Sequence, residues 1–171
     1  ENTIQFNYFM GDQLINVKYR DGRKNFKLYK GAEKVFYNIN SVVGYDWCVV
    51  VEGEMDVLAL HEAGIKNAIS VPNGATLNTN NLDYLDNCID YLDDKTKIIL
   101  AVDADAAGQA LRTEFIRRLG AEVCYLVDFN GQKDANEYLI ENGAEALRNA
   151  IHKSTQVPLE GVTTLYDIHD E

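Results

Sequence analysis

The chain has 171 residues, of which 46% are hydrophobic and 25% are charged, as expected for one or two soluble globular domains. Its longest apolar runs are Trp47–Val51 and Ile98–Val102, far short of the roughly 20 residues that cross a bilayer, so we expect no membrane association. The formal net charge is −11, which taken as a whole argues against a nucleic-acid partner.

The beginning of the chain predicts a small antiparallel sheet. Thr3–Phe9 and Gln13–Arg20 alternate apolar and polar residues, as half-buried strands do, and Lys24–Tyr29 alternates again. Asp21-Gly22 is a strong hairpin dipeptide between the last two runs. No charged and apolar leader follows Glu1, so we expect an excised part of a longer protein without a signal peptide.

This first part of the chain is basic, although the protein is acidic. Residues 1–51 carry seven basic and five acidic side chains, whereas residues 52–171 carry nine and twenty-two. The seven bases are Lys18, Arg20, Arg23, Lys24, Lys27, Lys30 and Lys34. We expect many of them to project from one surface that binds phosphates, the alternative being an ordinary solvated face. Tyr19, Phe26 and Tyr29 could stack on bases, but their phasing favours core packing.

From Asp46 the pattern changes to alternating strands and helices. The predicted strands are Trp47–Val51, Ala68–Val71, Ile98–Val102 and Glu122–Val127. The predicted helices are Glu54–Gly64, Asn81–Leu92, Ala106–Leu119, Ala135–Ile140 and Ala144–Ile151. Continuous apolar runs indicate strands that are buried on both faces. The fold class is therefore α/β, with a parallel sheet of about four strands flanked by helices.

These patterns predict that the chain consists of three parts. Residues 1–45 form the basic antiparallel β subdomain, residues 46–153 the α/β domain, and residues 154–171 a tail. The tail is too apolar to stay free, and its apolar residues are Val157, Leu159, Val162, Leu165, Tyr166 and Ile168. We expect it to be a connector that docks on a neighbouring subunit or a following domain; the alternative is a tail that folds back on its own sheet.

Acidic residues follow three of the predicted strands. The segments are Glu52-Gly53-Glu54-Met55-Asp56, Asp103-Ala104-Asp105 and Lys133-Asp134-Ala135-Asn136-Glu137. Ligands bind outside the carboxyl ends of such strands, so these acids should meet at one edge. Gly53 and Gly108 permit close backbone approach at the strand-to-helix turns. Glu54 and Glu137 are interpreted as acids of helix first turns.

This acid cluster predicts a site for a hard cation. The three histidines and three cysteines are scattered, so metal ligands must be oxygens, and the cysteines are interpreted as small buried residues. Clustered carboxylates repel one another unless cations neutralise them. Mg²⁺ or Mn²⁺ suits such a site and would bridge to phosphate, which indicates phosphoryl transfer or phosphodiester cleavage.

The three motifs also carry a resemblance. VVEGEMDVLALHEAG (50–64), AVDADAAGQALR (101–112) and KDANEYL (133–139) resemble the motifs of a TOPRIM domain, which is found in DnaG-type primases, topoisomerases and some small nucleases. The upstream segment GDQLINVKYRDGRKNFKLYKGAEKVFYNI resembles the basic subdomain of phage primase-helicases and their Twinkle-type relatives. Asn136 stands where DnaG-type primases have a second Asp, so it is not included among the ligands.

The resemblance implies roles for particular residues. Glu52, Asp103 and Asp105 match the catalytic acids. The implied metal ligands are Glu52, Asp56, Asp103, Asp105 and Asp134. The residues that match the nucleotide- and template-facing bases are Lys18, Arg20, Lys24 and Lys27.

The resemblance implies the RNA-polymerase (primase) module of a primase-helicase, a nucleotidyltransferase that makes RNA primers on single-stranded DNA from nucleoside triphosphates. Its helicase domain would follow Glu171, and the expected compartment is the cytoplasm of a bacterial or phage-infected cell. One alternative is a non-catalytic module that binds single-stranded DNA in a Twinkle-type helicase. A TOPRIM nuclease is a weaker alternative, and a topoisomerase is disfavoured because its strand-passing tyrosine lies outside this domain.

Overall fold

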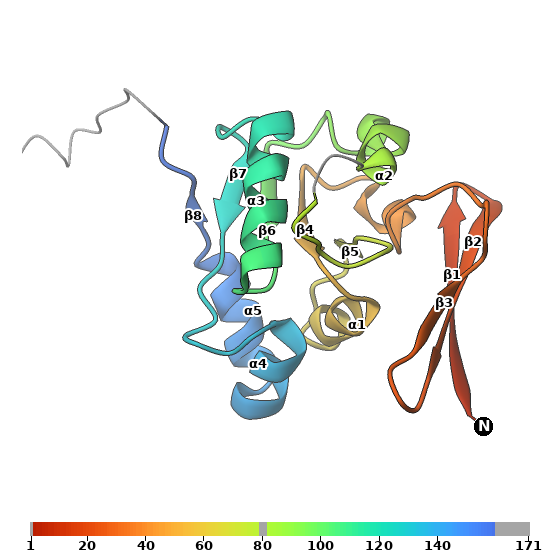
Figure 1. Cartoon of the computed structure of the whole chain (residues 1–171). Helices are drawn as coiled ribbons and strands as arrows, with labels where there is room; N and C mark the ends of the chain where they lie inside the picture. Colours follow the sequence, from red (N-terminus) through yellow and green to blue (C-terminus); the bar gives the residue numbers. More distant parts are fainter. Residues whose placement is uncertain (1, 79–81, 160–171) are drawn as a thin grey trace, which may run out of the picture.

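The computed structural model describes residues 2–78 and 82–159, which form two β-sheets and flanking helices (Figure 1). The smaller sheet consists of β1 (Thr3–Met10), β2 (Gln13–Asp21) and β3 (Phe26–Leu28), all antiparallel. This confirms the predicted small antiparallel sheet.

The larger sheet has five strands in the order β5-β4-β6-β7-β8. They are β4 (Trp47–Val51), β5 (Ala68–Ser70), β6 (Lys97–Leu100), β7 (Cys124–Leu126) and β8 (Thr155–Gln156). The first four in this order are parallel, which confirms the predicted sheet.

The fifth strand lies within the segment that the sequence assigned to the tail. β8 pairs with β7 in the antiparallel direction, and the Val157 N–H donates to the Cys124 carbonyl at 2.9 Å. Two polar residues next to Pro158 give no strand pattern, so the sequence did not predict this edge. The start of the tail therefore folds back on its own sheet, while Val162, Leu165, Tyr166 and Ile168 lie outside the described residues.

Helices cover both faces of the larger sheet (Figure 1). On one face α1 (Glu54–Glu62), α4 (Ala135–Asn142) and α5 (Ala144–His152) pack in a cluster with Val49 and Val51. On the other face α2 (Asp83–Asn87) and α3 (Ala106–Leu119) contribute to a second cluster that includes Cys48 and Val50. The alternation along β4 follows from the two-residue period of a strand, and explains why its sequence is apolar throughout. Cys48, Cys88 and Cys124 are buried free thiols, as predicted.

The predicted helix Asn81–Leu92 is wrong in its second half. α2 ends at Asn87, and a 3₁₀ turn, η2 (Ile89–Tyr91), follows. The structure buries Cys88 and leaves Ile89 41% exposed, because the tighter turn rotates the apolar positions away from an α-helical face. None of the helices in the described residues has the length and apolar character that would cross a membrane.

The small sheet is fixed against the larger one by aromatic packing. Phe6 and Tyr8 of β1 are buried and meet the Tyr37 ring edge-on, with centroids 5.7 and 5.3 Å away. Tyr37 in turn exchanges backbone hydrogen bonds with Ser70 at the end of β5. A short 3₁₀ helix, η1 (Ile39–Val42), packs in the same cluster. The small sheet therefore lies beside the carboxyl ends of the parallel strands, where the acidic segments are.

Candidate active site

Three acids from three segments meet at the carboxyl edge of the larger sheet. Asp56 lies in the first turn of α1, Asp103 follows β6, and Asp134 is the N-cap of α4. Each offers a carboxylate oxygen, and these oxygens lie within 4.8 Å of one another. We call these residues the acidic triad. The convergence of three strand-end motifs at one edge is the geometry that the sequence predicted.

Backbone hydrogen bonds hold the triad in place. Asp134 Oδ1 accepts from the Glu137 N–H at 2.8 Å, as an N-cap does, and Asp56 Oδ1 accepts from the Asn136 N–H at 3.0 Å. The second bond ties α1 to α4 across the site. Glu54 and Glu137 lie in helix first turns, as predicted.

Glu52 and Asp105 lie next to the triad in supporting positions. Glu52 Oε1 accepts from the Asp103 N–H at 2.8 Å, and its Oε2 accepts from the Ala75 N–H at 3.3 Å. Asp105 is exposed and caps α3 by accepting from the Gly108 N–H at 2.9 Å. Glu52 therefore orients Asp103 through the backbone, and Asp105 fixes the start of the helix that follows it.

Gly108 lies where a side chain has no room. A Cβ built there would stand 2.1 Å from the Asp103 carbonyl oxygen and 2.5 Å from Glu52 Oε1. This confirms the predicted close approach at Gly108. At Gly53 a Cβ would meet only Asp56 Oδ2, at 3.2 Å.

We expect Gly108→Ala to destabilise the protein by about 1–3 kcal/mol, because the backbone of Asp103 must move to admit the methyl group. Gly22→Ala is the control, since a Cβ at Gly22 meets nothing within 4 Å. Denaturant unfolding of both variants tests this. An unfolding free energy for Gly108→Ala equal to that of Gly22→Ala would contradict the close contact.

Burial and mutual repulsion perturb the acids of the site. Burial, followed by the Asp134 charge, raises the pKa of Asp56 to about 7. Burial, followed by the Asp103 charge, raises the pKa of Glu52 to about 7. Burial also raises the pKa of Asp103, while the Lys133 ammonium, 3.2 Å from Asp103 Oδ2, opposes that rise. Ionised carboxylates here are costly without a cation.

This repulsion predicts a pH-dependent effect of Asp56→Asn in the metal-free protein. Since the folded-state pKa is raised above the usual value of 3.8, wild type loses stability as pH rises from about 4 to about 7. The neutral amide keeps the hydrogen bond from Asn136 and avoids that loss. In a chelator, the variant should match wild type near pH 4 and exceed its unfolding free energy by about 1–3 kcal/mol near pH 8.

Urea unfolding at the two pH values measures the difference. Asp90→Asn, which changes an exposed acid outside the site, should shift the free energy by no more than about 0.5 kcal/mol at either pH. An Asp56→Asn variant that is less stable than wild type near pH 8 would contradict the repulsion.

The triad opens into a cleft between the two sheets. Its hollow is about 360 Å³. One wall carries Glu52, Asp56, Asp103, Asp134, Asn136 and Lys133, and the other carries Arg20, Lys24 and Phe26 of the small sheet. We call this hollow the acidic cleft. A second hollow that shares Glu52 and Phe26 with it continues the cleft toward Lys18 and Pro72.

The bases of the small sheet do not project from one surface, so that prediction was wrong. Arg20 and Lys24 line the acidic cleft, and Lys18 lies along the same face but is buried. Lys27 lies opposite Tyr19, and the pleat directs both away from the cleft. Lys24 is not in a strand but in the hairpin turn, with φ of 63°.

The expected core packing of three aromatic residues was also wrong. Tyr19, Phe26 and Tyr29 are 38%, 55% and 68% exposed. Phe6 and Tyr8 of β1 are buried, whereas Tyr19 and Tyr29 line a hollow on the face of this sheet that points away from the cleft, and Phe26 lines the cleft itself.

Lys18 links the small sheet to α1 and to the loop that follows β5. Its Nζ lies 2.8 Å from Glu54 Oε1 and donates to the Pro72 carbonyl at 2.9 Å. The Tyr8 hydroxyl donates to the same Glu54 oxygen. Burial raises the pKa of Tyr8, so this hydroxyl remains a donor.

Sequence reasoning missed three residues of the site. Lys133 forms an ion pair with Asp103, Asn136 contributes its N–H to Asp56, and Glu54 is a buried partner of Lys18. Lys133 is the first residue of the third motif, and its position beside Asp134 was the available signal for it. The burial of Glu54 depends on a contact 36 residues upstream, which no local pattern reveals.

The donor set fits a hard divalent cation. Asp56, Asp103 and Asp134 provide carboxylate oxygens alone, and the cleft above them leaves space for further oxygen ligands. Among the described residues, this is the group of acids that could hold a metal ion.

Comparison with known proteins identifies the family of this chain. Residues 49–139 match the family model described as Toprim-like. A primase homolog protein from Arabidopsis thaliana is 36% identical over 94% of this chain and 52% of its own length. A chloroplastic and mitochondrial Twinkle homolog protein from the same plant is 34% identical over the whole chain and 26% of its own length. The chain therefore spans about half, or about a quarter, of these curated relatives.

A solved structure shares the fold. The primase fragment of the bacteriophage T7 primase-helicase protein superposes with a TM-score of 0.72 and 26% identity, over 85% of this chain and 60% of that fragment. The resemblance seen in the sequence motifs is thereby confirmed.

Proposed function

This chain belongs to the Toprim-like family, and from that premise we propose that it is the RNA-polymerase module of a primase-helicase. The substrates are nucleoside triphosphates and a single-stranded DNA template, and a helicase domain belongs to the remainder of the longer protein. The proposed compartment is the cytoplasm of a bacterial or phage-infected cell. One relative, the Twinkle homolog protein, is chloroplastic and mitochondrial. The observation that carries the proposal is the acidic triad facing a basic wall across one cleft.

We assign different roles to the residues of the cleft. Asp56, Asp103 and Asp134 would hold Mg²⁺ or Mn²⁺, which when bound activates a 3′-hydroxyl and stabilises charge on the leaving pyrophosphate. Glu52 holds Asp103 through its backbone N–H, and its raised pKa suits a group that accepts a proton. Asp105 caps α3 and adds negative charge near the triad.

The opposite wall binds the substrates. Arg20 and Lys24 lie where they attract phosphates of the triphosphate or template, which the triad alone would repel. Lys18 Nζ and Arg20 Cζ lie over the exposed Phe26 ring, 4.8 and 5.8 Å from the ring centroid. This contact holds Arg20 over the cleft.

Nucleotide incorporation tests the proposal. The chain is mixed with labelled ribonucleoside triphosphates, Mn²⁺ and a single-stranded template carrying a short annealed RNA primer, which removes the need for start-site selection. We expect primer extension that depends on metal and template. Metal-dependent binding of the strand without extension would favour the non-catalytic Twinkle-type module, and strand cleavage would favour the nuclease.

A further inference from the structure

Another hollow lies on the face of the small sheet that points away from the acidic cleft. Register places Gln5 opposite Tyr19 and Tyr19 opposite Lys27, so these three residues share one face. The hollow measures about 740 Å³ and is lined by Thr3, Tyr19, Lys27, Tyr29 and Lys30. We call this surface the outer face.

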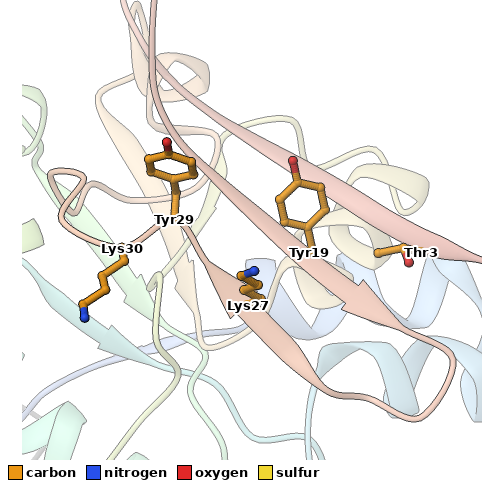
Figure 2. A pocket seen from close by; sticks show the side chains of 5 residues that line it. All are labelled: Thr3, Tyr19, Lys27, Tyr29 and Lys30. Atoms are coloured by element: carbon orange, nitrogen blue, oxygen red, sulfur yellow. The ribbon is translucent and has the colours of Figure 1, made fainter.

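Aromatic and basic side chains alternate across the outer face. Figure 2 shows Lys30, Tyr29, Lys27, Tyr19 and Thr3 following one another from left to right. The two tyrosine rings stand on the same side of the strands, and they are 38% and 68% exposed. Neither Lys27 nor Lys30 has an ion pair among those found in the described residues.

We propose that the outer face is a second binding surface for single-stranded nucleic acid, with bases stacked on Tyr19 and Tyr29 and phosphates held by Lys27 and Lys30. Exposed aromatic rings interleaved with cations on a sheet are the combination that single-strand binding requires, since every base has a face that can stack. The neighbouring side chains of β1 on this face, Gln5 and Asn7, are neutral and exposed.

Charge complementarity favours an anionic polymer as the occupant of the outer face. The chain as a whole carries a net charge of −11, so a positive strip attracts a polyanion while the rest of the surface repels it. Asp21 shares this face at the hairpin end, where its carboxylate accepts hydrogen bonds from the backbone and side chain of Asn25. The bound strand would therefore lie toward the Tyr29 and Lys30 end. Such binding does not depend on catalysis in the acidic cleft.

Anisotropy of a labelled oligodeoxythymidylate of about 16 nucleotides, near the upper site size for one small domain, tests the proposal. A chelator is present, so that no metal bridges phosphate to the acids. Tyr19→Ala with Tyr29→Ala should weaken binding at least about twentyfold, since each lost stack costs about fivefold or more. Tyr19→Phe with Tyr29→Phe keeps both ring faces and should bind as wild type does. Lys27→Ala with Lys30→Ala should reduce the salt slope by about 1.4.

Arg20→Ala with Lys24→Ala is the matched control, because it removes two cations from the cleft side of the same sheet. If only this variant weakened binding, the strand would lie in the cleft and the outer face would be refuted. Unchanged affinity of the variant with Tyr19→Ala and Tyr29→Ala would also refute the proposal, and would favour another segment of the longer protein as the partner of the outer face. Should that variant fail to fold, ultraviolet crosslinking of wild type to a bromodeoxyuridine strand decides: adducts at Tyr19 or Tyr29 support the outer face, and adducts confined to Phe26 overturn it.

Failure here differs from failure of the proposed function. We use a primed template whose single-stranded overhang is about 4 nucleotides, short enough to be held by the cleft alone. The tyrosine variants should extend the primer on this template as wild type does. Loss of that extension in the folded tyrosine variants would overturn the division into two surfaces.

Discussion

Asp103→Asn should lower nucleotide incorporation by about 10²–10³-fold, the scale on which loss of one group that stabilises transition-state charge is felt. Asp103 takes part in several interactions of the site. Its carboxylate belongs to the triad and pairs with Lys133, and its backbone N–H is bound by Glu52. The amide keeps the shape of the side chain but not the charge.

Metal binding gives a second measurement on the same variant. A ligand that binds only the folded state stabilises it by about 2.7 kcal/mol at a hundred times its Kd. We expect Mn²⁺ to raise the unfolding free energy of wild type, and Asp103→Asn to abolish most of that gain. Asp105→Asn should have a smaller effect, because asparagine caps a helix as well as aspartate does and only the charge is lost.

Asp90→Asn, an exposed acid outside the cleft, controls for the general loss of a charge and should leave both measurements unchanged. A combined Asp103→Asn and Asp105→Asn variant that still gained full stability from Mn²⁺ would place the metal elsewhere. An Asp103→Asn variant with wild-type incorporation would remove the acidic triad from the reaction.

The position of the acids at one edge of the sheet could be predicted from the sequence, because it follows from two general rules about parallel sheets. Continuous apolar runs mark β4 and β6 as buried parallel strands, and the carboxyl ends of such strands share an edge. Asp56 and Asp103 therefore had to lie near one another, and Asp134 reaches the same edge from the segment that follows β7. The two-residue spacing of Asp103 and Asp105 favours side chains that point the same way, whereas the Asp105 carboxylate caps α3 and is not one of the three acids of the triad.

The arrangement of the basic residues was harder to predict, because a shift of one residue in strand register moves a side chain to the opposite face of the sheet. Lys24 lies within the Asp21–Asn25 turn and Lys27 lies in β3, and they line hollows on opposite sides of the sheet. β8 gave no signal either, because its two residues are polar and their pairing depends on β7, some thirty residues earlier. Long-range contact, and not local preference, determined the pairing of β8.

Lys18→Met should lower the unfolding free energy by about 3–5 kcal/mol, the cost of leaving one member of a buried ion pair without its partner. The side chains of Lys18 and Glu54 are 9% and 4% exposed, and their charged atoms lie 2.8 Å apart. With the ammonium gone, the Glu54 carboxylate keeps the Tyr8 hydroxyl as a donor but loses its countercharge, and the Pro72 carbonyl loses the Lys18 donor.

A double-mutant cycle separates this pair from simple loss of packing. Glu54→Gln retains a group that can accept from Tyr8, so Lys18→Met with Glu54→Gln removes both charges together. We expect the double variant to be destabilised by about 1–3 kcal/mol less than the sum of the single variants. Additive effects in urea unfolding would show that the two residues are not coupled.

Arg117→Met is the matched control, since Arg117 is 68% exposed and pairs with Glu114 on the surface of α3. Its loss should cost no more than about 1 kcal/mol. The contrast matters for function, because Lys18 joins β2 to the start of α1 and to the Pro72 loop, and these segments form both walls of the cleft. A folded Lys18→Met protein should therefore hold Arg20 less firmly opposite the triad, and its apparent affinity for nucleoside triphosphates should fall while Mn²⁺ binding persists.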